Sequence, residues 1–174
     1  MKKNIMILAA MACIASFAFY SCSKDKNEQN TTLHVRLTDA PTAFDEVNVD
    51  IREVKVKFSD DTTNAGWVTL TTFPGVYNLL DYQNGVDTLL ATGAFPTQTI
   101  KEIRFVLGPN NTIKDAGIVY PLTIPSGSES GLKIKISRTL QATLETIIID
   151  FDAALSVKKE GTGDYKLRPV LKIR

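Results

Sequence analysis

The sequence is poor in the residues that most often build reactive sites and disulfide scaffolds. Its 174 residues include two cysteines, one histidine and one tryptophan. Two cysteines are too few for a fold held together by disulfides, and a formal net charge of +1 lacks the basic excess of nucleic-acid-binding proteins. With 44% hydrophobic residues, the chain is also too apolar for intrinsic disorder. These absences leave one globular domain and predict no nucleic-acid partner.

The first 21 residues have the pattern of an export signal. Lys2 and Lys3 precede an apolar run over residues 5–20, which is too short and wrongly flanked for a stable membrane span. Cys13 lies inside this run and leaves with it. We therefore predict a lipoprotein signal peptide over residues 1–21, and removing it shifts the formal net charge from +1 to −1.

The end of the apolar run carries the lipidation signal. Phe19-Tyr20-Ser21-Cys22 resembles a bacterial lipobox, in which a small residue precedes the cysteine that becomes the acylated N-terminus. We therefore predict lipidation of Cys22, with acyl chains such as palmitate. Phe19 and Tyr20 are bulkier than the usual residues at their positions, and the alternative is ordinary cleavage that leaves Cys22 as a free thiol.

The segment after Cys22 is predicted to be a flexible tether over residues 22–32. Residues 23–32 contain no aliphatic or aromatic side chain. Ser23 directly after the cysteine favours an outer-membrane lipoprotein over one retained in the inner membrane. Ser23-Lys24-Asp25 partly matches the tags that direct some lipoproteins to the outer face, so the periplasmic and the surface-exposed face both stay open. The expected partner here is the membrane itself, through the lipid anchor.

From residue 33 to residue 174 the sequence predicts a single all-β domain. Leu33, Val35 and Leu37 alternate with polar residues, as in a half-buried strand. Similar segments separated by turn signals predict an antiparallel β-sandwich of the immunoglobulin/transthyretin-like type. Only residues 87–93 are compatible with a helical turn. The further strands are predicted at residues 67–70, 76–80, 103–107, 118–124, 132–136, 144–151 and 167–173.

Two irregularities are predicted within these strands. The apolar residues Val47, Val49 and Ile51 have the opposite parity to the next set, which starts at Val54. One extra residue at Arg52-Glu53 would restore a single buried face, so we expect a β-bulge there. Pro169 lacks a backbone donor, so the last strand should be an edge strand or irregular at that point.

Several short segments occur in the following order along the chain: Leu37-Thr38-Asp39-Ala40-Pro41, Phe44-Asp45-Glu46-Val47, Asn78-Leu79-Leu80-Asp81, Ile103-Arg104-Phe105-Val106-Leu107, Pro125-Ser126-Gly127, Ser130-Gly131-Leu132-Lys133, Asp150-Phe151-Asp152 and Tyr165-Lys166-Leu167-Arg168-Pro169-Val170. In this order they resemble the bacterial lipoprotein family catalogued as domain of unknown function 4382. The resemblance implies a β-sandwich of immunoglobulin or transthyretin type on an exported lipoprotein, with no established activity and no catalytic residues to carry over.

Acidic residues are the candidates for a metal site. Asp150 and Asp152 are two apart at a strand end and share one face, and Asp39 follows the first strand. If the loops meet, Asp39, Asp150 and Asp152 supply oxygens that suit Ca²⁺, although no recognisable calcium loop is present. The alternative is structural: Asp39 and Asp152 each precede a turn and can accept hydrogen bonds from its backbone N–H groups.

Other residues give weaker chemical signals. The single histidine, His34, lies on the polar face of a strand with no nucleophile evident nearby, which argues against a hydrolase triad and a histidine-based zinc site. Thr62 and Thr88 each follow an aspartate in short segments similar to periplasmic O-glycosylation acceptors.

No catalytic residue is predicted, and we expect a non-enzymatic binding or structural module. Its expected setting is the cell envelope, on an outer-membrane anchor, and its partner is an unidentified envelope protein or glycan. The alternative is a carbohydrate-active enzyme, or an accessory subunit of a glycan-uptake system. Paired carboxylates across a cleft or exposed aromatic side chains would favour that alternative.

Overall fold

The computed structural model describes residues 30–60, 65–125, 131–161 and 163–174. The predicted signal peptide, Cys22 and Thr62 lie outside these ranges. Two short helices, η1 (Leu79–Tyr82) and α2 (Ala153–Ser156), interrupt a series of strands. The strands are β1 (Thr31–Thr38), β2 (Glu46–Lys57), β3 (Trp67–Thr69), β4 (Thr71–Thr72), β5 (Gly75–Asn78), β6 (Thr88–Phe95), β7 (Thr99–Leu107), β8 (Thr112–Asp115), β9 (Ile118–Thr123), β10 (Leu132–Thr139), β11 (Leu144–Phe151), β12 (Val157–Glu160), β13 (Asp164–Leu167) and β14 (Leu171–Ile173).

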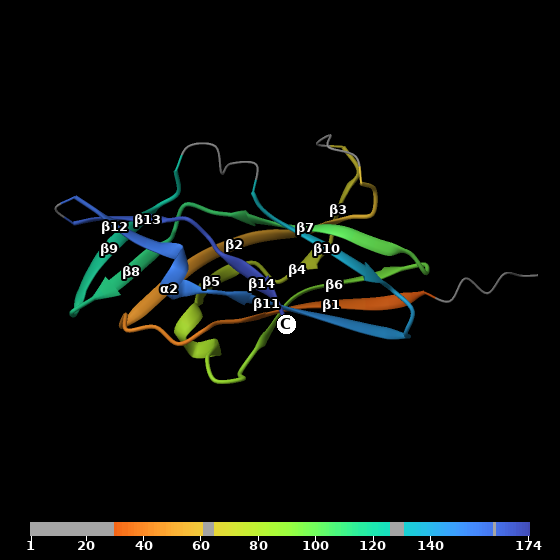
Figure 1. The fold of residues 1–174 in the computed structure, drawn as a ribbon, viewed down its shortest axis with the longest axis horizontal. Helices are drawn as coiled ribbons and strands as arrows, with labels where there is room; N and C mark the ends of the chain where they lie inside the picture. The colour runs from red at the N-terminus through yellow and green to blue at the C-terminus, as the bar shows by residue number, and fades with distance from the viewer. Residues whose placement is uncertain (1–29, 61–64, 126–130, 162) are drawn as a thin grey trace, which may run out of the picture.

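The strands form two layers, which confirms the all-β sandwich. One sheet has the order β14-β11-β1-β6-β4, and the other has the order β10-β7-β2-β8-β9-β13-β12, with β3 and β5 also paired to β2. In the view of Figure 1, β1, β6 and β11 lie below β2 and β7. Among the described residues, no helix is long and apolar enough to cross a bilayer.

The sheets are mixed, whereas the sequence predicted antiparallel pairing. The pairs β1·β11 and β9·β13 are parallel, and the other recorded strand pairs are antiparallel. Parallel neighbours need a long crossover connection, and local periodicity carries no information about such a connection.

The buried face of β1 follows the predicted alternation. Leu33, Val35 and Leu37 are fully buried, and they belong to the same apolar core as Ile149 and Phe151 of β11. The strand starts at Thr31, so Thr31 and Thr32 belong to β1, although the sequence pattern assigned both to the tether. Burial of aliphatic side chains on both layers is the main stabilising contribution to a sandwich of this kind.

The predicted bulge in β2 is confirmed. The register of β2 against β7 shifts between Ile51 and Glu53. Ile51 and Val54 are both fully buried, while Arg52 is exposed. The extra residue therefore returns the second half of the strand to the core face, as the change of parity required.

The helical turn that the sequence allowed at residues 87–93 does not form, because most of this segment belongs to β6. The register between β6 and β1 shifts between Val35 and Arg36: Val35 pairs with Ala91 and Arg36 with Leu89. Leu90 is thus the extra residue of a bulge, and Leu90 and Ala91 are both fully buried. Two adjacent buried residues break the period of two, which is why the pattern did not indicate a strand.

The last predicted strand, residues 167–173, is divided at Pro169. Leu167 ends β13 in one sheet and Leu171 begins β14 at the edge of the other. The irregularity expected at Pro169 is therefore confirmed as a change of sheet. Strands β4, β6, β8 and β12 were not predicted, and of β13 only the last residue, Leu167, was. The predicted strand at residues 76–80 ends at Asn78, whose side chain caps η1.

The loop between β7 and β8 is fastened to β2 around Asp50. The N–H of Gly108 donates to the carbonyl of Asp50 (2.7 Å), and the N–H of Asp50 donates to Oδ1 of Asn111 (2.9 Å). The fully buried carboxylate of Asp50 pairs with the guanidinium of Arg52, Oδ1 to Nε 2.7 Å. A Cβ on Gly108 would lie 2.5 Å from that Nε and closer still to Oδ2 of Asp50. Only glycine fits this close approach of loop and strand.

We expect Gly108→Ala to lower the free energy of unfolding by about 1–3 kcal/mol, because the methyl group must displace the buried carboxylate of Asp50 and the Arg52 side chain paired with it. Gly75→Ala is the matched control, since its Cβ would meet only Tyr77 at 3.7 Å, an ordinary contact. Urea denaturation of both variants measures the difference. Equal stability of the two variants would contradict the packing described for the loop.

Candidate functional site

The three predicted acidic residues come together at one end of the β1·β11 pair. Thr38 of β1 pairs with Asp150 of β11, and because the two strands are parallel their C-terminal ends coincide. Asp39 directly follows β1, and Asp152 directly follows β11 as the N-cap of α2. The exposed fractions of Asp39, Asp150 and Asp152 are 1%, 5% and 6%. The condition on which the sequence-based calcium hypothesis depends, that these loops meet, is fulfilled.

Asp39 joins the end of β1 to two other segments. Its Oδ1 accepts the N–H of Ala153 at 2.9 Å, and its Oδ2 accepts Nε2 of Gln83 at 3.0 Å. Burial raises the pKa of Asp39 above its ordinary value, although the hydrogen bonds from Ala153 and Gln83 oppose this shift. The carboxylate thus performs the turn-stabilising role that the sequence offered as the alternative to calcium.

Asp152 is held by the helix it caps and by β14. Its Oδ1 accepts the N–H of Leu155 at 3.0 Å, and its Oδ2 accepts Nζ of Lys172 at 2.8 Å. Burial alone would raise the pKa of Asp152, but the bonds from Lys172 and Leu155 outweigh it and lower the pKa. Asp152 is therefore a structural anion, ionised across the neutral range.

Asp150 is the third carboxylate and fastens the last strand. Its Oδ2 accepts Nε of Arg174 at 2.9 Å, and a second guanidinium nitrogen lies 2.8 Å away. Its Oδ1 is buried without a hydrogen-bond partner in the described structure. The ion pairs of Asp150 with Arg174 and of Asp152 with Lys172 attach β14 to β11 in addition to the backbone ladder.

The contacts of Asp39, Asp150 and Asp152 bear on the hypothesis that this cluster binds Ca²⁺. Within the described ranges, no group of three or more His, Cys, Asp or Glu residues could hold a metal ion. Oxygens of Asp150 and Asp152 already face Arg174 and Lys172. A cation that needs six to eight oxygens would have to compete with these charges. A calcium site at Asp39, Asp150 and Asp152 stays an untested prediction.

The remaining sequence candidates in the described ranges have no recorded hydrogen bond or ion pair with this cluster. Thr88 is half-buried at the start of β6, opposite Leu37, and its glycosylation is untested. His34 is half-buried on β1, and its cross-strand neighbours are Thr92 and Thr146. Neither residue joins the acidic cluster.

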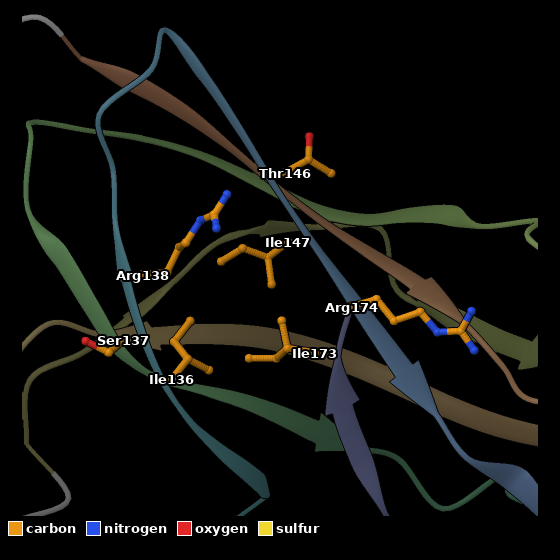
Figure 2. Close-up of a pocket in the computed structure, with 7 residues that line it drawn as sticks. All are labelled: Ile136, Ser137, Arg138, Thr146, Ile147, Ile173 and Arg174. Atoms are coloured by element: carbon orange, nitrogen blue, oxygen red, sulfur yellow. The ribbon is translucent and has the colours of Figure 1, made fainter.

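Sequence reasoning missed a pocket of about 230 Å³ between the edges of the two sheets. Figure 2 shows three isoleucine side chains from β10, β11 and β14 directed toward one another, with an arginine on either side in this view. Local patterns gave no signal for this pocket, because its lining residues come from strands of both sheets. The pocket is lined by Ile136, Ser137, Arg138, Thr146, Ile147, Ile173 and Arg174.

A second hollow, of about 300 Å³, has an aromatic wall. The rings of Tyr120 and Tyr165 are 5.0 Å apart, and Nζ of Lys159 lies 5.2 Å from the Tyr165 ring centre. The hydroxyl of Tyr165 donates to Asp115. A larger hollow of about 520 Å³ lies between residues 107–111 and 121–125 and is mostly apolar.

The fold and these contacts define a β-sandwich module whose buried carboxylates hold its own loops and last strand. The family model described as Domain of unknown function (DUF4382) matches residues 30–169. The chain belongs to this family, which confirms the resemblance found in the sequence. No curated protein and no solved structure matches the chain.

We expect Asp152→Ala to lower the free energy of unfolding by about 1–2 kcal/mol, because the variant loses both the helix cap and the pair with Lys172. Asp152→Asn is the control: it retains an acceptor for Leu155 and loses only the charge, so its loss should be smaller. Since the folded state lowers the pKa of Asp152 from 3.8, the wild-type advantage over Asp152→Asn should be present at neutral pH. It should disappear as the pH falls through the lowered pKa, which denaturant titrations at several pH values would measure.

We also expect the melting temperature of chelator-treated protein to stay unchanged on addition of millimolar Ca²⁺, because Lys172 and Arg174 already neutralise the carboxylates. Magnesium at the same concentration controls for ionic strength. A rise specific to Ca²⁺ that Asp150→Asn abolishes would instead establish a calcium site.

Proposed function

We propose that the protein is a lipoprotein of the outer membrane, tethered through Cys22, that acts as a non-enzymatic binding or structural module of the cell envelope. The observation that carries the non-enzymatic part is the use of the buried carboxylates. Asp39, Asp150 and Asp152 each accept hydrogen bonds from groups that hold the fold together. A general acid or base instead needs an oxygen directed toward a substrate, whereas the one oxygen of these carboxylates without a hydrogen-bond partner, Oδ1 of Asp150, is buried.

The lipobox pattern at Cys22 supports the tether. Residues 23–30 separate that cysteine from the start of β1 at Thr31. At about 3.3–3.6 Å per residue, this stretch reaches roughly 30 Å at most. The β-sandwich would therefore stay close to the bilayer that holds the acyl chains, where a membrane-associated partner is within reach.

The second candidate, an accessory role in glycan uptake, is favoured by the aromatic hollow at Tyr120 and Tyr165. Polar side chains of Thr123, Asp164 and Lys166 border the same hollow. Aromatic rings beside a few polar groups form the kind of surface that orients a small ligand. However, Tyr165 is 2% exposed and its hydroxyl is bonded to Asp115, so little of its ring is accessible to a sugar.

Metabolic labelling with an alkyne-modified fatty acid in the native host tests the proposal. Wild-type protein should be labelled and should sediment with outer-membrane fragments, because the acyl chains provide the attachment. Cys22→Ala should be unlabelled and should remain with the precursor or the soluble fraction. Cys13→Ala is the matched control, and it should be labelled like the wild type because Cys13 leaves with the signal.

Two outcomes would contradict this function. A wild-type mature N-terminus at any residue other than an acylated Cys22 removes the anchor. Release of reducing sugar from envelope polysaccharides by the purified lipoprotein, lost on substitution of a carboxylate beside the aromatic hollow such as Asp164, would replace the binding module by an enzyme.

A further inference from the structure

The edge of β11 is covered by β14 over only part of its length. On one side, β11 pairs with β1 from Leu144 to Asp150. On the other side, its pairing with β14 extends only from Ile149 to Phe151. The half of the strand that starts at Leu144 has no strand on that side in the described structure, so one row of backbone groups faces outward.

The backbone groups on this open edge can be assigned. The N–H of Arg174 donates to the carbonyl of Ile148 at 3.0 Å, so the backbone of Ile148 faces the β14 side. The N–H and C=O groups of successive residues point to opposite edges of a strand. Those of Leu144 and Thr146, four and two residues before Ile148, therefore also point to the β14 side. The edge therefore offers donors and acceptors in line with β14, as an incoming strand requires.

The apolar pocket lies directly beside this open edge. Ile136 comes from β10, the edge strand of the opposite sheet, while Ile147 and Ile173 come from β11 and β14. Figure 2 shows the three side chains converging below Thr146 in this view. Ile173 is 43% exposed. A strand added in line with β14 would cover the exposed side chain of Ile173 and the pocket with its inward side chains.

The open edge carries neither lysine nor proline. Edge strands are often protected against pairing by lysine, proline, a bulge or an inward-pointing charge. Residues 144–148 of β11 are Leu-Glu-Thr-Ile-Ile, and their one charged side chain, Glu145, is already paired with Arg138. By contrast, the edge strand β10 carries Lys133 and Lys135. The edge of β11 is therefore less protected against pairing than that of β10.

The charges around the edge favour an acidic occupant. The side chain of Arg138 is 58% exposed, while its partner Glu145 is 13% exposed. Likewise, Arg174 is 51% exposed and its partner Asp150 is 7% exposed. The cations are thus the outermost charged groups on both sides of the pocket. A carboxylate on an incoming strand can contact either guanidinium without displacing the buried partner.

We propose that this edge binds an extended segment of another envelope protein, which adds a strand antiparallel to β11 and in line with β14. The segment carries aliphatic side chains at alternate positions over the three isoleucines and carboxylates near Arg138 and Arg174. This inference rests on the proposed binding function and names the partner class. The chain's own tether, residues 23–30, does not fit, because it has no aliphatic or aromatic side chain to fill the pocket.

The test uses the mature acylated protein in detergent and a fluorescent eight-residue peptide of alternating valine and glutamate. Fluorescence anisotropy should show saturable binding below about 1 mM. A peptide N-methylated at alternate residues should not bind, because it cannot complete the ladder, and a lysine–valine peptide should bind more weakly.

Variants of the protein locate the site. Thr146→Pro removes an outward N–H without touching the ladder to β1, and it should weaken binding about tenfold or more. Ile173→Thr keeps a branched shape while making the pocket polar, and it should also weaken binding. Arg138→Gln should weaken binding most at low salt. Arg168→Gln, an arginine with a 59% exposed side chain paired with Glu160 away from the edge, is the matched control and should change nothing.

Three results would overturn the proposal. The first is no saturable binding of the valine–glutamate peptide to folded wild-type protein. The second is binding that the N-methylated peptide reproduces, or that the Thr146→Pro and Ile173→Thr variants both retain. The third is a wild-type dimer in sedimentation that Thr146→Pro converts to a monomer, which makes a second copy of the chain the occupant. None of these results affects the labelling of Cys22, so failure here is distinguishable from failure of the anchored-module function.

Discussion

The parallel pairing of β1 with β11 is the contact on which the rest of the structure depends. It joins the first strand to a strand more than a hundred residues later, at the centre of one sheet. Because the strands run in the same direction, their final residues lie side by side, and Asp39, Asp150 and Asp152 converge there. Each of these carboxylates then holds another segment: Asp39 reaches Ala153, and the other two reach β14. The acidic cluster is thus a consequence of strand direction, and it stabilises the end of the sandwich.

The hydrophobic pattern of the sequence predicted the structural features that depend only on residues close together in the chain. The bulge in β2 followed from the change of parity between Ile51 and Val54, because one extra residue is the simplest way to keep both in the core. The same reasoning failed at β6, where the bulge at Leu90 placed two adjacent residues in the core. That arrangement is fixed by pairing with β1, which lies more than fifty residues earlier in the sequence. Tertiary pairing therefore overrode the local pattern.

The candidate sites show the same division between features set by nearby residues and features set by tertiary contacts. The sequence singled out Asp39, Asp150 and Asp152, but it could not show that Gln83, Lys172 and Arg174 occupy their oxygens, because these partners come from other elements. The pocket at Ile136, Ile147 and Ile173 could not be predicted from the sequence pattern at all. Its walls belong to two sheets, and its opening depends on how far β14 extends after the chain changes sheet at Pro169.

The entry point of the chain into the sandwich has a consequence for geometry at a membrane. Thr32 pairs with Leu144, so the start of β1 lies beside the start of β11, at the end of the sandwich where β11 has no second neighbouring strand among the described residues. The proposed anchor at Cys22 is separated from Thr31 by residues 23–30, so it would keep this end within roughly 30 Å of the lipid headgroups. A partner fixed in the same leaflet would then meet the protein by diffusing within the plane of the membrane, at nearly the same height above it. The resulting high local concentration could compensate for a small contact area.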